Sequence, residues 1–252
     1  MGVLNVTPDS FSDGGELLSN EVLLHDRLME RAVQMVADGA AILDIGGEST
    51  RPGAAPVSLQ EELDRVMGAV RLIAPRLDVI LSIDTSTPEV MREAAHAGAG
   101  LLNDVRAFSR DGAMGAAVAS QLPVSLMHMS DEPDRMQEQT KYVDVVTDVK
   151  AFLAHRIAAC REAGIAKCQM RIDPGFGLGK TVEQNYEMLR RLEEFASFDL
   201  PILVGVSRKS MIGAITGRPA SERLVPSAVL AVMAAARGAS VIRVHDVAET
   251  AD

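Results

Sequence analysis

The feature that most limits how this chain can fold is a regular alternation of short apolar runs with longer stretches of helical periodicity. The runs have the length of strands and little alternation of apolar with polar positions, as expected of strands buried on both faces. A strand, a helix and a second strand in succession form a parallel pair with a right-handed crossover. Eight such units in 252 residues predict an α/β fold, a single (β/α)8 TIM barrel. The predicted strands cover residues 2–6, 41–45, 79–83, 100–102, 123–127, 170–172, 202–206 and 240–244.

The stretches between these strands carry apolar residues at helical spacing. Residues 28–36, 59–70 and 146–160 show this spacing, which predicts helices with one buried face. Residues 87–89 combine a capping threonine, a first-turn proline and an acidic residue, so a helix is expected to begin there. Because no linker rich in Pro, Gly or Ser divides the chain, we expect one domain over residues 1–252.

Both ends of the chain are short for a closed barrel. Met1 stands directly on the first predicted strand, and only seven residues follow His245. A barrel of this kind normally covers its last strand with a final helix. We therefore expect either a trimmed chain that lacks this helix or a second subunit that covers the outer side of the last and first strands, and we favour the trimmed chain.

Composition excludes several classes of protein. With 47% hydrophobic and 24% charged residues, the chain has the balance of a soluble globular protein. No apolar run approaches the roughly 20 residues that span a bilayer, and no export signal is visible. The net charge of −10 argues against a general nucleic-acid binder. Cys160 and Cys168 fit neither a zinc site nor a redox pair, so we expect a reduced, cytoplasmic location.

Polar residues stand where nearly every predicted strand ends. The active site of a TIM barrel lies at the carboxyl ends of its strands. Burying so many polar groups there costs free energy unless a ligand or a hydrogen-bond network satisfies them, so we expect a ligand site. Helix capping is the alternative: it stays equally open for Asp44 and Asp104, whereas Thr87 is a better cap than Asp84. The strand-end residues are Asn5, Asp44, Asp84, Asn103, Asp104, His128, Asp173, Ser207, Arg243 and His245.

Three loops add charge at the mouth of the predicted barrel, which is the end where the carboxyl ends of the strands meet. Residues 7–15 and 46–53 form long polar loops that contain glycines and could close over a substrate. Residues 207–210 should begin a helix, whose N-terminus favours an anion. An anionic substrate or leaving group is therefore expected, although a surface salt bridge is an equally open role for Arg51 or Arg208 alone. The expected cationic side chains are Arg51, Lys209, Arg243 and His245.

Some patterns along the chain do not carry the function that they suggest. Residues 174–181 resemble a phosphate-binding P-loop, but Pro174 occupies the place of the first required glycine, and the spacing fails the dinucleotide pattern too. We reject nucleotide binding and interpret these glycines as letting backbone pass beside a flat ligand. Met127 and Met129 are either core filler or pocket wall. The histidines expected at the surface of helices are His25, His96 and His155.

Seven short stretches together resemble one family. In order along the chain they are residues 5–15, 46–53, 84–86, 103–104, 173–175, 207–210 and 243–245. They are similar to the dihydropteroate synthase family, and seven in the right order are far more specific than any one alone. The resemblance implies a transferase of folate biosynthesis. Such an enzyme joins p-aminobenzoate to 6-hydroxymethyl-7,8-dihydropterin pyrophosphate, and it releases pyrophosphate and 7,8-dihydropteroate.

The resemblance also implies roles for individual residues. The pterin would be held by Asp84, Asn103, Asp173 and Lys209, with Met127 and Gly205 in the same substrate pocket. Pyrophosphate would meet Asn5, Arg243 and His245, while Mg²⁺ would meet Asn5 and Asp13. The p-aminobenzoate pocket would be Phe11, Thr50, Arg51, Pro52, Ser207 and Lys209. The catalytic set would be Asp13, Lys209, Arg243 and His245.

The same resemblance implies a mechanism and an assembly. Pyrophosphate would leave first, and the neutral arylamine would attack the resulting pterin cation, which calls for charge neutralisation and water exclusion. The family forms homodimers through late helices, so a homodimer is expected if the missing final helix is not required. Leu178 departs from the family, where many relatives carry phenylalanine. With no insertion beside Pro52, sulfonamide binding is also expected.

Two other functions remain as alternatives. A pterin-binding methyltransferase barrel of the corrinoid-linked type would share the fold and the pterin-binding carboxylates, but it would not explain the two long loops and the cationic mouth. A non-catalytic pterin-binding paralogue would be expected to have lost Asn5, Lys209 or His245, and all three are present.

Overall fold

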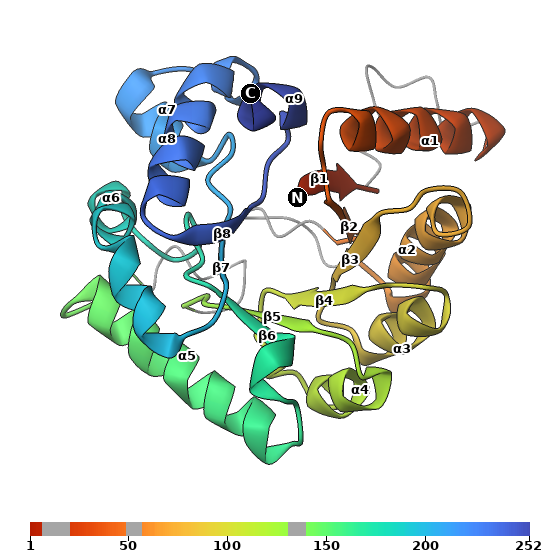
Figure 1. Cartoon of the computed structure of the whole chain (residues 1–252), viewed down its shortest axis with the longest axis horizontal. Helices are drawn as coiled ribbons and strands as arrows, with labels where there is room; N and C mark the ends of the chain where they lie inside the picture. The colour runs from red at the N-terminus through yellow and green to blue at the C-terminus, as the bar shows by residue number, and fades with distance from the viewer. Residues whose placement is uncertain (7–20, 49–56, 131–139) are drawn as a thin grey trace.

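A computed structural model describes residues 1–6, 21–48, 57–130 and 140–252 of the chain (Figure 1). Its sheet has eight parallel strands that follow one another in chain order. The strands are β1 (Gly2–Asn5), β2 (Ile42–Gly46), β3 (Ile80–Asp84), β4 (Leu101–Asp104), β5 (Val124–Met127), β6 (Met170–Asp173), β7 (Ile202–Val204) and β8 (Ala239–Ile242). Each begins and ends within two residues of a predicted strand, so the strand prediction is confirmed.

Nine α-helices are found among the described residues, and Figure 1 shows them around the outside of the ring of strands. They are α1 (Glu21–Ala37), α2 (Leu59–Ile73), α3 (Pro88–His96), α4 (Ala113–Ser120), α5 (Val145–Glu162), α6 (Val182–Arg190), α7 (Ser210–Thr216), α8 (Leu224–Ala236) and α9 (Val247–Ala251). Short 3-10 turns cover Lys167–Gln169, Leu192–Phe198 and Ala220–Glu222. The predicted helical stretches lie in α1, α2 and α5, and the three histidines expected at helix surfaces are exposed on α1, α3 and α5. None of the described helices is long and apolar enough to cross a membrane.

The sheet closes on itself just beyond β8. Gly2 and Val244 form a parallel bridge, the Val3 amide donates to the Val244 carbonyl at 2.9 Å, and the Val244 amide donates to Met1 at the same distance. On the outside, a Cβ atom at Gly2 would lie 3.0 Å from Met35 on α1 and 3.2 Å from Val247 on α9. The fold is therefore the predicted barrel, and a short α9 packs against its first strand.

The sequence predicts little alternation of apolar with polar positions along each strand, but the inner faces of the strands carry polar residues. Outward-facing residues such as Ile45 and Ile83 join the apolar core with the helices. The inward row of neighbouring residues is Asn5, Gly46, Asp84, Asn103, Ser125 and Arg171, which lie side by side in the registers of β1 to β6. Both faces are buried, but the inner face near the carboxyl ends is polar, because that end holds the candidate site.

The start of α3 shows how a strand-end loop is fixed. Thr87 is the capping residue, as predicted, yet its side chain makes no capping hydrogen bond. Its hydroxyl instead donates to Glu62 of α2 at 2.6 Å, and the Thr85 hydroxyl donates to the same buried carboxylate. These two bonds anchor the loop that follows Asp84 to the helix behind it.

Candidate active site

The carboxyl ends of the strands bring opposite charges together inside the barrel. Arg243, just after β8, donates from Nε to Asp44 of β2 at 2.6 Å. Its second amino group donates to Asp84 of β3 at 2.9 Å. A single guanidinium thus joins three strands, and it leaves two carboxylates on one wall of the mouth.

Asn103 lies beside Asp84 in the β3–β4 register and is 4% exposed. Its Nδ2 donates to Asp44 at 3.3 Å, whereas its Oδ1 is buried without a hydrogen-bond partner. A buried acceptor without a partner is costly, and it is expected to be satisfied by a group that is absent from the chain itself. This atom therefore indicates a ligand that brings an N–H or O–H donor.

Burial and neighbouring charges act differently on the pKa values of Asp84 and Arg243 in this wall. Burial, together with the neighbouring Asp44 carboxylate, raises the pKa of Asp84 to about 7, although Arg243 works in the opposite direction. Burial alone would lower the pKa of Arg243, but Asp44 and Asp84 outweigh it and the pKa is raised. Arg243 therefore keeps its charge, while Asp84 can bind a proton near neutrality.

The opposite wall is formed by the β6–α6 loop and by Lys209. Asp173 accepts a hydrogen bond from the Gly175 amide at 2.7 Å, and burial raises its pKa. Lys209 donates to the Phe176 carbonyl, and burial lowers its pKa to about 8 although Asp173 and Asp84 favour the charge. Lys209 thus contacts this loop, and the charges of the two predicted pterin carboxylates, Asp84 and Asp173, act on its pKa.

Lys180 is a second buried lysine, and the sequence reasoning missed it. Its ammonium donates to the carbonyls of Gly175 and Leu178, both at 2.8 Å, and lies 2.9 Å from His128 Nδ1. Burial, with the help of Lys180, lowers the pKa of His128 to about 2, so the imidazole is neutral and accepts. The sequence shows a lysine that follows a segment with three glycines. That pattern does not predict that the lysine side chain is buried.

The glycines of this loop lie against the protein's own atoms. Gly175 has a φ of +73°, and a Cβ atom there would come within 1.8 Å of the His128 carbonyl. Gly177 has a φ of +76°, and its Cβ atom would meet Lys209 Cδ at 2.9 Å. Both positions need glycine for the left-handed backbone and for close packing. Within the chain itself these glycines pack against His128 and Lys209, and their interpretation as a place where backbone passes beside a flat ligand stays a prediction.

Ser207 and His245 form a pair after β7 and β8. The Ser207 oxygen lies 3.0 Å from His245 Nδ1, and it accepts from the His245 amide at 3.2 Å. Burial and the nearby Arg243 lower the pKa of His245 to about 4, so the ring is neutral and a weak base. The Ser207 hydroxyl can donate to Nδ1, and in that tautomer the ring proton of His245 lies on Nε2.

One strand-end residue, Asp104, and one loop residue, Arg208, turn out to be structural. Asp104 accepts hydrogen bonds from the Arg106 and Phe108 amides at 2.9 and 2.7 Å and from the Ser86 hydroxyl, so it shapes the loop after β4. Arg208 pairs with Asp246 at 2.9 Å, which is the salt-bridge role left open for it. Buried Arg106 also donates to Ser86 and lies 3.9 Å from Glu48, and this link between two strand-end loops was missed from sequence.

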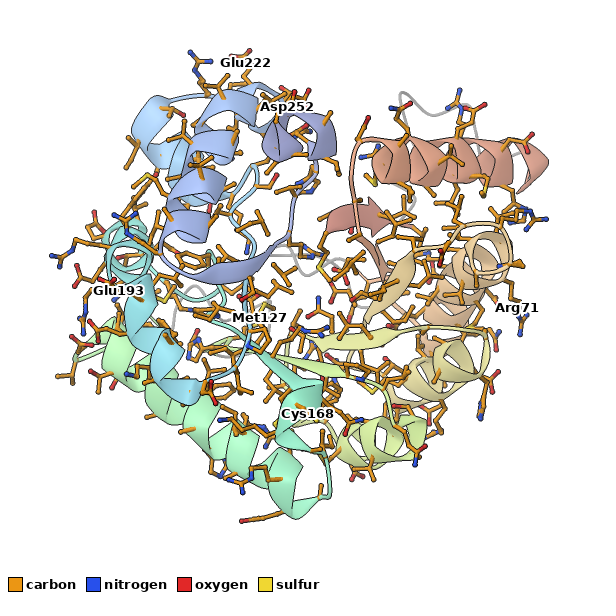
Figure 2. The ribbon with its side chains drawn as sticks, in the orientation of Figure 1. Arg71, Met127, Cys168, Glu193, Glu222 and Asp252 are labelled. Carbon is orange, nitrogen blue, oxygen red and sulfur yellow. The ribbon has the colours of Figure 1, made fainter. Side chains whose placement is uncertain are left out.

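The remaining predicted residues divide by whether the structure describes them. Phe11, Asp13, Thr50, Arg51 and Pro52 lie outside the described residues. Met127 packs with Val105 and Leu178 in a small apolar cluster, and Figure 2 shows Met127 near the centre of the ring of strands. A Cβ atom at Gly205 would lie 3.6 Å from Arg243 Cβ, so this glycine lies beside the arginine of the mouth.

Asn5 is the predicted metal ligand that the structure does describe. A Cβ atom at Gly46 would lie 3.7 Å from Asn5 Oδ1 and 3.8 Å from Asp84 Oδ2, so Gly46 lies close beside two side-chain oxygen atoms of the mouth. Oxygen donors of this kind suit Mg²⁺. Within the described ranges no group of three or more His, Cys, Asp or Glu side chains could hold a metal by itself.

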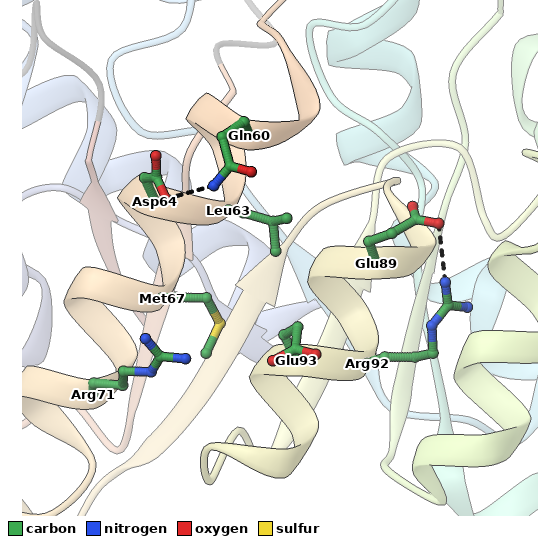
Figure 3. A pocket seen from close by; sticks show the side chains of 8 residues that line it. All are labelled: Gln60, Leu63, Asp64, Met67, Arg71, Glu89, Arg92 and Glu93. Carbon is green, nitrogen blue, oxygen red and sulfur yellow. Dashed lines mark hydrogen bonds and ion pairs between the residues drawn. The ribbon is translucent and has the colours of Figure 1, made fainter.

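A hollow on the outer surface lies between α2 and α3 (Figure 3). Four of its polar side chains bond within their own helices: Gln60 donates to Asp64 at 2.8 Å, and Arg92 pairs with Glu89 at 3.0 Å. These groups already have partners, so the barrel mouth is the better candidate for a ligand site.

Comparison with known proteins points to one family. Residues 1–245 match the family model described as pterin binding enzyme. The chain is 52% identical to dihydropteroate synthase of Escherichia coli strain K12, covering 100% of this chain and 88% of that one. It is 48% identical to the Haemophilus influenzae dihydropteroate synthase, covering 100% and 90%.

Solved structures agree with this match. The Yersinia pestis dihydropteroate synthase in a sulfonamide complex has a TM-score of 0.93 at 52% identity, covering 99% of this chain and 89% of that chain. The Xanthomonas albilineans dihydropteroate synthase with 4-aminobenzoic acid has a TM-score of 0.92 at 44% identity, covering 100% and 88%. The latter enzyme is also known in complex with 7,8-dihydropteroate, with a TM-score of 0.89 at 41% identity and the same coverage.

Proposed function

The chain belongs to the pterin-binding family of dihydropteroate synthases, which are transferases, and from that premise we propose how its residues divide the reaction. The enzyme joins p-aminobenzoate to 6-hydroxymethyl-7,8-dihydropterin pyrophosphate and releases pyrophosphate. The single observation that supports the pterin site is the buried, unpartnered Oδ1 of Asn103 beside the Asp84 carboxylate. A pterin has the ring N–H and amino donors that such acceptors require, and its carbonyl suits the Lys209 ammonium.

Arg243 and His245 would receive the pyrophosphate. Arg243 remains charged because its pKa is raised, and neutral His245 can donate its Nε2 proton to a phosphate oxygen. Asn5 and Asp13 would hold Mg²⁺, which when bound would neutralise charge on the pyrophosphate. Removal of the metal by EDTA should abolish turnover and leave the melting temperature of the ligand-free protein unchanged. Unchanged turnover would remove Mg²⁺ from the proposal.

The site suits a reaction in which the leaving group departs before the arylamine attacks. The Ser207–His245 pair resembles a nucleophile with its base, but a pKa of about 4 makes His245 a poor base. The site therefore works by positioning and charge rather than by covalent catalysis. Excluding water from the pterin cation is the role that we assign to the loops 7–15 and 46–53.

Pyrophosphate release is the test of the reaction. Release from the pterin pyrophosphate with Mg²⁺ should be stimulated by p-aminobenzoate, and dihydropteroate should form. Asp84→Asn should lose pterin binding by calorimetry while it still melts cooperatively. Unchanged pterin affinity would contradict the role of Asp84, and a folded wild-type protein that forms no dihydropteroate would contradict the function.

The p-aminobenzoate pocket would consist of Phe11, Thr50, Arg51, Pro52, Ser207 and Lys209, of which the first four lie outside the described residues. Arg51→Ala should raise the KM for p-aminobenzoate far more than the dissociation constant of the pterin pyrophosphate. An equal loss of both would mean that this loop does not bind the second substrate. A sulfonamide should compete with p-aminobenzoate, and a failure to compete would overturn sulfonamide binding by this chain.

A homodimer and a cytoplasmic location complete the proposal. On α8, Val225, Val229 and Val232 are 53–65% exposed and share one face of a helix without charged residues, and Ile215 of α7 is 63% exposed. Such an apolar face suits a second copy of the chain. Val229→Asp should shift the protein toward the monomer in light scattering, whereas Val143→Asp, at an isolated exposed valine, should not. A monomeric wild-type protein would contradict the dimer.

A further inference from the structure

Asp44 is a buried carboxylate of the mouth for which neither the sequence nor the proposed function provides a role. It lies on the inner face of β2 and is 0% exposed. It does not cap the following helix, because Ser58 caps α2. Its oxygens contact side chains from β4 and from the segment after β8: Asn103 at 3.3 Å and Arg243 at 2.6 Å.

The contact with Asn103 decides which way the amide faces. An ionised carboxylate only accepts hydrogen bonds, so it can hold the Nδ2 end of an asparagine but not the Oδ1 end. While Nδ2 faces Asp44, Oδ1 must face the other way, and that is the buried oxygen without a partner. Asp44 therefore fixes whether Asn103 presents an acceptor or a donor to a ligand.

The contact with Arg243 acts on the same side chain that would bind the leaving group. Nε is bound to Asp44, and one amino group is bound to Asp84. A ligand that brings its own donors to Asp84 can replace that amino group while Nε stays on Asp44. The guanidinium would then face an anion from a fixed anchor.

We propose that Asp44 is a positioning residue that selects the substrate by locking the Asn103 amide with its oxygen toward the pterin and by anchoring Arg243 through Nε. It touches neither substrate itself. The proposal rests on the proposed function, since it concerns the same pterin site. Its distinctive consequence is selectivity: without the carboxylate, Asn103 can rotate its amide and accept or donate equally well.

The test compares Asp44→Asn with Glu62→Gln. Glu62 is a matched control because it is also a buried carboxylate (3% exposed). Its partners are the hydroxyls of Thr85 and Thr87, whereas those of Asp44 are Asn103 and Arg243. Calorimetry uses two probes, 6-hydroxymethylpterin and 6-hydroxymethyllumazine, in which a carbonyl acceptor replaces the amino donor. Turnover of the pterin pyrophosphate supplies KM and kcat.

Wild-type protein and Glu62→Gln should prefer the pterin probe by the same ratio. Asp44→Asn should bind the pterin probe about tenfold or more weakly, and its preference over the lumazine should shrink, because a charged hydrogen-bond partner has been removed. The KM for the pterin pyrophosphate should rise more than kcat falls. Selectivity equal to that of Glu62→Gln would overturn the proposal.

A second variant keeps the test decisive if Asp44→Asn does not fold. The double variant Asp44→Asn with Arg243→Gln removes both charges of this pair, which is less damaging than leaving Arg243 without Asp44. Asp84 also loses its contact with Arg243, but its pKa of about 7 lets it bind a proton near neutrality. It should melt cooperatively and still show the reduced preference for the pterin probe. Wild-type selectivity in this variant would overturn the role of Asp44, whereas an inactive wild-type protein would instead overturn the proposed function.

Discussion

Two cations of the barrel mouth are satisfied in opposite ways. Arg243 is bound by the carboxylates of Asp44 and Asp84, which come from distant strands. Lys180 is bound by two carbonyls of its own loop and by the neutral His128 ring. Neighbouring carboxylates raise the pKa of Arg243 by more than burial lowers it. Burial and the nearby charge of Lys209 instead both lower the pKa of Lys180.

The difference separates a functional charge from a structural one. Arg243 is charged and shares its donors between two acids, so an incoming anion or donor can change its partners. Lys180 has two of its bonds to carbonyls of its own loop and the third to His128 after β5, which leaves little to exchange with a ligand. We infer that Lys180 stabilises the β6–α6 loop, whereas Arg243 binds substrate.

The largest expected effect comes from removing the loop cation. Lys180→Met should lower the free energy of unfolding by about 2 kcal/mol or more, because a buried acceptor that loses its donor costs about 1–3 kcal/mol. Pterin affinity should fall as well, since the Phe176 carbonyl that binds Lys209 lies in this loop. Denaturant unfolding and calorimetry measure both quantities.

Lys167→Met is the control for this loss. Lys167 is half-exposed and pairs with exposed Asp199 at 3.0 Å, so its replacement should change stability by no more than about 1 kcal/mol. If the two methionine variants unfolded at the same denaturant concentration, the structural role of Lys180 would be wrong.

A pH series should separate the cations next. Burial lowers the pKa of Lys209 to about 8, so pterin affinity should fall as the pH rises above 8 and the ammonium loses its proton. Stability should move the other way. The unfolded chain holds this proton up to its ordinary pKa of 10.5, so between about 8 and 10.5 the unfolded state binds more protons and the contribution of Lys209 to stability rises.

Calorimetry at pH 7, 8 and 9 measures the affinity, and melts of the wild type against Lys209→Met isolate the stability. Lys209→Arg should flatten the decline in affinity, because arginine does not titrate in this range. A pterin affinity that stays constant from pH 7 to 9 would contradict the role of Lys209 as a charged donor.

The smallest effect is expected where a polar group has no partner at all. The Ser125 hydroxyl is buried in the barrel without a hydrogen bond, so Ser125→Ala should be neutral or stabilising by less than about 1 kcal/mol. Ser207→Ala, which removes the bond to His245, should cost about 1 kcal/mol instead. Chemical unfolding of both variants checks the contrast, and a clear destabilisation by Ser125→Ala would mean that its hydroxyl is hydrogen-bonded in solution.

Much of the fold could be predicted because its signals are local. Strand positions follow from short apolar runs, and the helices α1, α2 and α5 follow from spacing along the chain. The ends of the same apolar runs placed Asp84, Asn103 and Asp173 at strand ends. Position at a strand end could not separate these, without the family resemblance, from Asp104 and His128, which also end strands but serve the loops around them.

The sequence by itself determined the barrel, the order of its strands and the polar groups at their carboxyl ends. Only the tertiary structure decided which of these groups meet. Arg243 and Asp44 stand 199 positions apart, and they touch because the sheet closes just beyond β8. The inward turn of Lys180 likewise depends on the closeness of His128 to Gly175. Periodicity records local preference, whereas partner choice depends on burial and distance, which exist only once the chain has closed.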